Sequence, residues 1–160
     1  MKKIFYLMAA LLPALAFTAC DDKDELPDVD FNVAISNASF VDNEIYVVQG
    51  DTLTIDGVEA INNEQGKGVT IPYVNYYFDG LFLGQEAIAP YGFKIDVNDN
   101  VMIGTHYLKM TCPVFAVDKE PGYAIITYKV NVIESSDDIP SSGVQAVLTN
   151  SDVIDVVSNS

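Results

Sequence analysis

Short hydrophobic runs, separated by polar and flexible residues, dominate the sequence between residues 31 and 133. The runs are rich in Val, Ile, Tyr, Phe and Thr, and Gly, Asn and Asp punctuate them. No segment of this region repeats its apolar residues with the 3.6-residue period of a helix. The pattern therefore predicts an all-β domain. Its candidate strands cover residues 31–36, 44–48, 52–60, 70–78, 81–85, 93–97, 105–117 and 123–133.

Turn residues sharpen this prediction at two places. Asp79-Gly80 stands between the runs Tyr76-Tyr77-Phe78 and Leu81-Phe82-Leu83, and a tight hairpin turn favours such residues because both adopt positive φ. Pro113 lies inside the candidate strand 105–117, where we expect a break or bulge because proline cannot donate to a ladder. Seven or eight short strands over about 100 residues indicate an antiparallel β-sandwich.

The N-terminus has a different pattern. Lys2 and Lys3 precede an apolar run, Ile4 to Phe17, that is shorter than the roughly 20 residues of a transmembrane helix. Residues 1–19 thus have the anatomy of a secretory signal peptide. The stretch Phe17-Thr18-Ala19-Cys20 resembles the lipobox of bacterial lipoproteins, with Phe where Leu is usual. The resemblance implies a covalent lipid at Cys20 that anchors the chain to a membrane. Ordinary cleavage beside Ala19, which would release a secreted protein, is the alternative.

The residues after Cys20 are strongly acidic. Lys23-Asp24-Glu25 resembles the export signal of lipoproteins from the Bacteroides group, which implies an outer-membrane protein displayed on the cell surface; a solvated acidic tether is the alternative interpretation. We predict a tether over residues 20–30 and a sandwich over residues 31–133. Residues 134–160 would then form a linker and a tail that is either flexible or a single strand.

Charge excludes one class of partner. The formal net charge is −15, with 23 acidic residues against 8 basic ones, and the chain has no arginine. Binding to phosphate backbones requires patches of Lys and Arg, so nucleic acid is excluded as a partner. The same deficit argues against direct adhesion to anionic lipid headgroups. The predicted contact with a membrane is therefore through the lipid anchor.

Three spaced clusters in the middle of the chain carry a family resemblance. They read Val74-x-Tyr76-Tyr77-x-Asp79-Gly80-x-x-x-Gly84, then Pro90-Tyr91-x-Phe93, then Gly104-x-His106-x-Leu108-x-Met110. This pattern resembles bacterial immunoglobulin-like domains that accompany extracellular carbohydrate-active enzymes and surface lipoproteins. The resemblance implies an immunoglobulin-like sandwich with Tyr76 in the core of strand C. It also implies that His106, on strand F, takes the place of a corner tyrosine and bonds to a loop backbone.

No catalytic motif is found in the sequence. It has no G-x-S-x-G, H-E-x-x-H, P-loop or C-x-x-C pattern, and we predict that the protein is not an enzyme. Oxygen ligands for calcium cluster in one loop, at Asp96, Asn98, Asp99 and Asn100. A turn that uses Asn and Asp to cap its own backbone is the favoured interpretation. Cys112 lies in an apolar stretch and is predicted to be a small buried hydrophobe. No cofactor is expected apart from the lipid at Cys20.

Alternation along the strands places several tyrosines on one outer face. If Tyr76 points inward, then Tyr73 and Tyr77 point outward, and Tyr107 does so on strand F. Exposed tyrosines suit glycan or protein recognition, although cross-strand aromatic pairing is the alternative. We therefore predict a surface-anchored, non-catalytic binding or structural module with a glycan or an envelope protein as partner. A pilus-like assembly subunit that donates its C-terminal segment as a strand is the second hypothesis.

Overall fold

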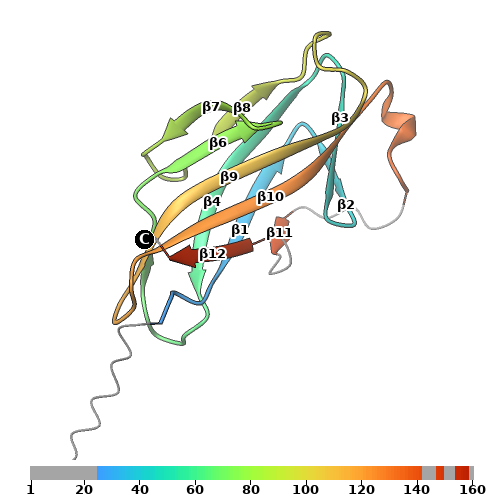
Figure 1. Ribbon diagram of the computed structural model, residues 1–160. Coiled ribbons are helices and arrows are strands. Elements are labelled where there is room, and N and C mark those ends of the chain that lie inside the picture. Colours follow the sequence, from blue (N-terminus) through green and yellow to red (C-terminus); the bar gives the residue numbers. More distant parts are fainter. Residues whose placement is uncertain (1–24, 142–146, 150–153, 159–160) are drawn as a thin grey trace, which may run out of the picture.

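Two β-sheets pack face to face in the computed structural model, which describes residues 25–141, 147–149 and 154–158 (Figure 1). The smaller sheet has the strand order β11-β1-β4-β8. Its neighbouring strands are all antiparallel. Their bounds are Val29–Ser36 for β1, Thr52–Asn62 for β4, Phe93–Asp96 for β8 and Val147–Thr149 for β11.

The larger sheet has the order β2-β3-β10-β9-β6-β7. Strand β3 runs parallel to β10, and β9 lies antiparallel between β10 and β6. Two short strands lie off this path, with β12 pairing with β10 and β5 pairing with β9. The bounds are Ser39–Val41 (β2), Glu44–Val48 (β3), Val69–Thr70 (β5), Val74–Phe78 (β6), Leu81–Glu86 (β7), Gly104–Ala116 (β9), Gly122–Ile133 (β10) and Ile154–Ser158 (β12).

This order confirms the predicted immunoglobulin-like sandwich. Strands β6, β9 and β10 correspond to C, F and G of that fold and share one sheet, while β1, β4 and β8 correspond to A, B and E in the other. A 3₁₀ turn, Ser136–Asp138, follows β10. Within the described residues, no helix is long and apolar enough to cross a membrane.

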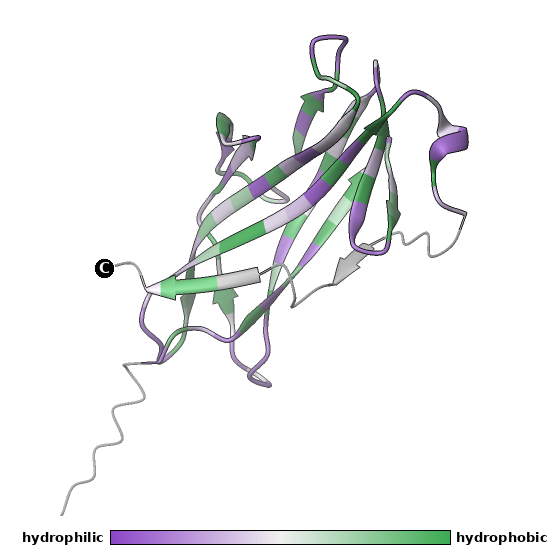
Figure 2. Ribbon diagram, turned by 45° about the vertical axis from the view of Figure 1, so that its right-hand side comes forward, coloured by the Kyte–Doolittle hydropathy of each residue, from purple (hydrophilic) through white to green (hydrophobic). Residues whose placement is uncertain are grey.

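Alternation of side chains builds the core between the sheets. Along β10, every second residue from Gly122 to Val132 is buried, and Figure 2 shows hydrophobic and hydrophilic residues alternating along the long strands. Burying one such side chain contributes about 1.5–3 kcal/mol, so the two inner faces supply most of the folding free energy. The largest fully buried side chains are Tyr76, Tyr128, Phe31, Phe40, Ile45, Leu53, Ile55, Leu108, Met110, Ile126 and Val33.

Some strand boundaries differ from the prediction. The expected strand 70–78 is divided into β5 and β6 around Pro72, which has no N–H to donate. Pro113 does not break β9, although a break or bulge was expected there. It lies between the stretches of β9 that pair with β6 and with β5, where a missing N–H costs no ladder hydrogen bond. The pairing of β9 with β10 is therefore continuous through Pro113.

The ends of the domain also differ from their predicted bounds. Strand β1 begins at Val29 and Pro27 is buried, so the sandwich includes the last residues of the predicted 20–30 tether. The C-terminal tail contributes two short strands where at most one was expected. Strand β11 pairs with β1 and β12 pairs with β10, so the tail adds one strand to each sheet. The predicted signal peptide and Cys20 lie outside the described residues.

Candidate functional site

The outer face of the larger sheet carries a row of aromatic and basic side chains. Tyr77 on β6 faces Phe82 on β7 on one side and Lys109 on β9 on the other. The rings of Tyr77 and Phe82 lie 5.4 Å apart at an interplanar angle of 59°. The Lys109 ammonium lies 4.7 Å from the centre of the Tyr77 ring, a cation–π contact. This geometry arises because the two-residue Asp79-Gly80 turn sets Tyr77 opposite Phe82.

Tyr107 extends this row along β9. It precedes Lys109 by two residues on the same face of the strand, and 54% of its side chain is exposed. Phe82 is similarly exposed at 53%, whereas Tyr77 is half-buried between its neighbours. We call Tyr77, Phe82, Tyr107 and Lys109 the aromatic cluster. Its rings present apolar area to solvent while the phenol and ammonium groups remain able to bond.

The predicted tyrosine face is thus only partly assembled. Tyr77 and Tyr107 lie close to Lys109, as their positions on β6 and β9 require, and neither lies in the core. Tyr73 precedes β6 and is half-buried at the opposite end of that strand from the Asp79-Gly80 turn. Four residues of extended chain span about 13 Å, so Tyr73 does not join the aromatic cluster. Phe82 completes it instead.

A second row of polar side chains lies beside the aromatic cluster. Lys129 on β10 faces Tyr107 on one side and Glu44 on the other, and its ammonium lies 2.8 Å from the Glu44 carboxylate. Asn131 donates to the other oxygen of Glu44 at 2.7 Å, and these two bonds lower the pKa of Glu44. The row therefore fixes the surface around Tyr107 and presents paired rather than free charges.

The far end of the same face is held by hydrogen bonds between neutral groups. Gln85 donates to Asn75 at 2.9 Å, and the Thr111 and Tyr123 hydroxyls lie 2.9 Å apart. Asn75 reaches both of these hydroxyls at 3.4–3.5 Å. Thr111 lies on the outer face of β9, but its neighbours bury it to 5% exposure. This end is a closed network across four strands and offers fewer groups to a partner than the aromatic cluster does.

His106 holds the end of the sheet next to the aromatic cluster. Its Nδ1 lies 2.6 Å from the Asp79 carboxylate, and its Nε2 lies 2.7 Å from the Met102 carbonyl. The ring also stacks on Phe78 at 5.3 Å. Because both nitrogens face acceptors, the imidazolium form can donate to both of them at once. The bond to a loop carbonyl confirms the corner role predicted for His106.

This geometry explains the directions in which the pKa values of His106 and Asp79 shift. Burial of the imidazole opposes its charge, but the bonds to Asp79 and to the Met102 carbonyl outweigh burial and raise the pKa of His106. Partial burial of Asp79 is likewise outweighed by its bonds to His106 and to the Tyr107 amide, which lower the pKa of Asp79. Neither imidazole nitrogen is available to accept a proton from a substrate, so this histidine cannot serve as a general base in this state.

The remaining candidate residues take structural roles. Asn98 accepts the Asn100 amide at 3.0 Å, and Asp96 accepts the Thr52 hydroxyl at 2.9 Å. The Asn98 bond fits the backbone-capping interpretation of the loop that also contains Asp99, whereas the Asp96 bond joins the side chains of two neighbouring strands. Across the described residues, no three His, Cys, Asp or Glu side chains are grouped to hold a metal ion. Cys112 is fully buried, and burial raises the pKa of its thiol to about 12.

Comparisons with known proteins give only distant likenesses in structure. No protein-family model matches the chain, and no curated protein matches it. A structure of the fibronectin(III)-like modules of Clostridium thermocellum CbhA is similar at 18% identity and a TM-score of 0.38. The match covers 66% of this chain and 47% of that chain, so this chain spans about half of the solved one. The fold assignment given above rests on the strand order of the chain itself.

Proposed function

We propose that this protein is a surface-anchored lipoprotein whose immunoglobulin-like domain is a non-catalytic binding module. The anchor is the lipid at Cys20, and the contact surface is the aromatic cluster. The observation that carries the proposal is the gathering of Tyr77, Phe82 and Tyr107 around Lys109 on one exposed face. Tyrosine is among the side chains that most often act as energetic anchors of recognition surfaces.

The geometry favours an envelope protein over a glycan as the partner. The rings of Tyr77 and Phe82 are tilted by 59° and so do not form one flat platform for stacking against a sugar ring. Leu81, at the adjacent turn, is 68% exposed and adds apolar area beside them. Protein interfaces combine such apolar contacts with aromatic anchors, and glycan binding is the alternative outcome of the test.

The position of the aromatic cluster relative to the anchor supports this proposal. The described chain begins beside the β9–β10 turn, where Glu25 pairs with Lys119 at 2.7 Å (Figure 1). Tyr107 lies near the opposite end of β9, nine residues and about 30 Å from Ala116. A domain anchored through the residues ahead of Glu25 would thus direct the aromatic cluster away from the membrane.

A matched pair of substitutions tests this assignment. Tyr107→Ala removes an exposed aromatic from the aromatic cluster. Phe115→Ala removes one of similar exposure (46%) from the same face of β9 at its other end. Capture of envelope proteins by the purified domain should weaken by about 1–2 kcal/mol or more for Tyr107→Ala and remain unchanged for Phe115→Ala. Equal capture by both variants would remove the aromatic cluster as the binding surface, and binding on a glycan array would reassign the partner class.

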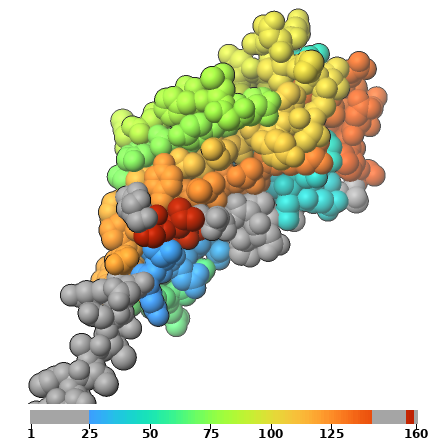
Figure 3. Space-filling model, in the orientation of Figure 1, coloured from blue at the N-terminus to red at the C-terminus, as the bar shows by residue number. Residues whose placement is uncertain are grey.

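One observation favours the second candidate function, an assembly subunit that donates its C-terminal strand. Strand β12 pairs with the first half of β10, from Gly122 to Ile126, beside the stretch that pairs with β3. Figure 3 shows β12 lying between β10 and the start of the described chain. A strand so placed can be supplied by a second molecule. Concentration-dependent self-association of the purified domain, lost on truncation after Ser142, would favour this role.

A further inference from the structure

The smaller sheet is incomplete along one edge of β4. Strand β8 pairs only with Thr52–Ile55, whereas β4 continues to Asn62. Strand β5 lies near the exposed part of this edge, but it pairs with β9 of the other sheet. Within the described chain, no strand is therefore paired with β4 from Asp56 to Asn62 on this side. Exposed strand edges present rows of hydrogen-bonding groups that accept a further strand.

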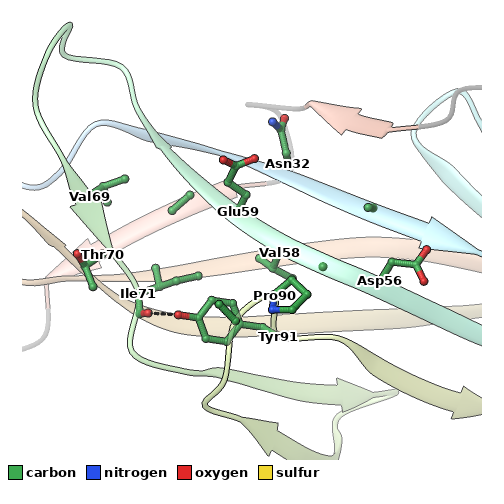
Figure 4. A pocket seen from close by; sticks show the side chains of 13 residues that line it. Asn32, Asp56, Val58, Glu59, Val69, Thr70, Ile71, Pro90 and Tyr91 are labelled. Carbon is green, nitrogen blue, oxygen red and sulfur yellow. Dashed lines mark hydrogen bonds between the residues drawn. The ribbon is translucent and has the colours of Figure 1, made fainter.

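A groove follows this edge. Its volume is about 780 Å³, and its walls come from β1, β4, β5 and the Ala89–Tyr91 segment (Figure 4). Most of the lining is apolar and includes Ala34, Val58, Ala60, Val69, Ile71 and Pro90. Small residues on β1 and β4 leave space in the groove, since Ala34 faces Gly57 in the register of these two strands.

The wall opposite β4 is held in place by hydrogen bonds. The Tyr91 hydroxyl donates to the Ile71 carbonyl at 2.5 Å, a bond that Figure 4 shows as a dashed line. The buried Tyr76 hydroxyl in turn donates to the Tyr91 carbonyl. Tyr91 is therefore held at two points, its side-chain hydroxyl and its backbone carbonyl. A groove with such a wall exists before any occupant arrives, which lowers the cost of binding.

The backbone of β4 is oriented for strand addition. The Val58 amide donates to the Pro90 carbonyl at 2.9 Å, so this amide points away from β1 and into the groove. In an antiparallel ladder the direction of these groups alternates along the strand. The N–H and C=O of Ala60, two residues on, therefore point the same way as the Val58 amide. They lie beyond Pro90, at the part of the edge where β8 no longer pairs.

The charge around the groove indicates which partner sequences would bind in it. Asp56 and Glu59 are exposed at the rim, and no lysine is among the lining residues. The whole chain carries a net charge of −15, so a second copy is a poor match for an acidic groove. An extended segment presents alternate side chains to opposite sides. Apolar side chains would then enter the hollow, and basic ones would meet the acidic rim.

We propose that the edge of β4 from Glu59 to Asn62, beyond the part that Pro90 covers, is a strand-addition site for an extended segment of a partner protein with alternating apolar and basic residues. The main-chain groups at Ala60 supply the pairing, and the groove supplies pockets for the apolar side chains. This site lies on the smaller sheet, away from the aromatic cluster, so its test does not depend on the function proposed above.

The test uses the fluorescein-labelled peptide Lys-Val-Lys-Val-Lys-Val-Lys and the Cys20→Ala form of the full chain. We expect saturable binding that weakens with added salt, and failure to bind at millimolar peptide would overturn the proposal. Ala60→Pro should weaken binding at least tenfold, because it removes the outward N–H. The fold should survive, since that N–H does not serve the ladder with β1. An unfolded Ala60→Pro variant would leave the decision to the modified peptides described next.

Modified peptides give a readout that does not depend on the fold of a variant. A strand added at one edge uses the amides of every second residue, so N-methylation in one register should abolish binding and in the other should leave it intact. Equal effects in both registers would contradict strand addition. Glu59→Gln should weaken binding and its salt dependence, whereas Asp42→Asn, a matched loss of charge at the β2–β3 turn, should change neither.

Discussion

Two buried tyrosines of the core differ in whether the hydroxyl has a hydrogen-bond partner. Tyr76 and Tyr128 are both at most 1% exposed, and burial raises the pKa of each. The Tyr76 hydroxyl donates to the Tyr91 carbonyl. The Tyr128 hydroxyl is buried and has no hydrogen-bond partner within the described chain. A buried polar group without a partner costs folding free energy, so the same atom is stabilising at one position and destabilising at the other.

Replacing each tyrosine with phenylalanine should separate these effects. Tyr76→Phe removes a donor and leaves the Tyr91 carbonyl unpaired, so the free energy of unfolding should fall by about 1–3 kcal/mol. Tyr128→Phe removes an unpaired hydroxyl and keeps the ring against Phe40, so stability should stay the same or rise by about 1 kcal/mol. Urea unfolding of both variants measures this, and equal destabilisation would contradict the assignment of the two hydroxyls.

At the scale of elements, a titratable pair joins the β6–β7 turn to the start of β9. His106 and Asp79 meet at 2.6 Å, and Asp79 also accepts the Tyr107 amide at 2.9 Å. The pKa of His106 is raised, so its stabilising contribution is fully present below about pH 6.5 and is lost as pH rises through the folded pKa. The pKa of Asp79 is lowered, so its contribution is lost only in acid.

The stability of the domain should therefore fall as pH rises from 6 to 9. His106→Gln keeps polar atoms near Asp79 but cannot ionise, so this part of the pH dependence should flatten in the variant. His106→Ala should cost about 1–3 kcal/mol at pH 6, because it leaves the Asp79 carboxylate and the Met102 carbonyl without their shared donor. Thermal melting of all three proteins across this range gives the answer. A parent whose pH profile matches that of His106→Gln would show that the pair does not titrate.

How far the sequence predicts each element depends on whether the signal is local. Alternation of apolar residues identifies β10 because this strand buries every second residue along its length. The two-residue Asp79-Gly80 turn places Phe82 opposite Tyr77, so this part of the aromatic cluster was readable from the sequence although it was not predicted. The gap beside β4 could not be predicted, since it depends on where β8 stops pairing and not on any property of β4.

At the scale of the whole molecule, the first and last parts of the described chain both pack against one glycine, Gly122. A Cβ added at Gly122 would lie 2.9 Å from Val156 on β12 and 3.0 Å from Pro27, which precedes β1. Gly122 also pairs with Ser158 on one side and Val114 on the other. This close approach lets β12 and the start of the domain pack on the same part of β10, at the end where Glu25 and Lys119 pair.

A side chain at Gly122 should therefore displace β12 while sparing the central sheets. We expect Gly122→Val to make the chain after Ser142 sensitive to limited proteolysis and to lower stability by about 1–3 kcal/mol, the usual cost of overpacking. Gly80→Ala serves as a comparison, since an added Cβ there meets open space and the cost comes only from the positive φ. If proteolysis of the tail is unchanged in Gly122→Val, β12 does not depend on this contact.

Anchoring is the last expectation, and it rests on the sequence around Cys20, which lies outside the described residues. Two acyl chains give stable membrane attachment because each buried CH₂ contributes about 0.8 kcal/mol. Cys20→Ala should therefore move the protein from the membrane fraction to the aqueous fraction. The domain should be unaffected, since the described strands begin at Val29. The native melting temperature of the released protein is the control for folding.

Protease added to intact cells should cleave the parent, as display on the cell surface requires. A Cys20→Ala variant that still fractionates with membranes would overturn the lipoprotein assignment, and with it the outward orientation inferred for the aromatic cluster.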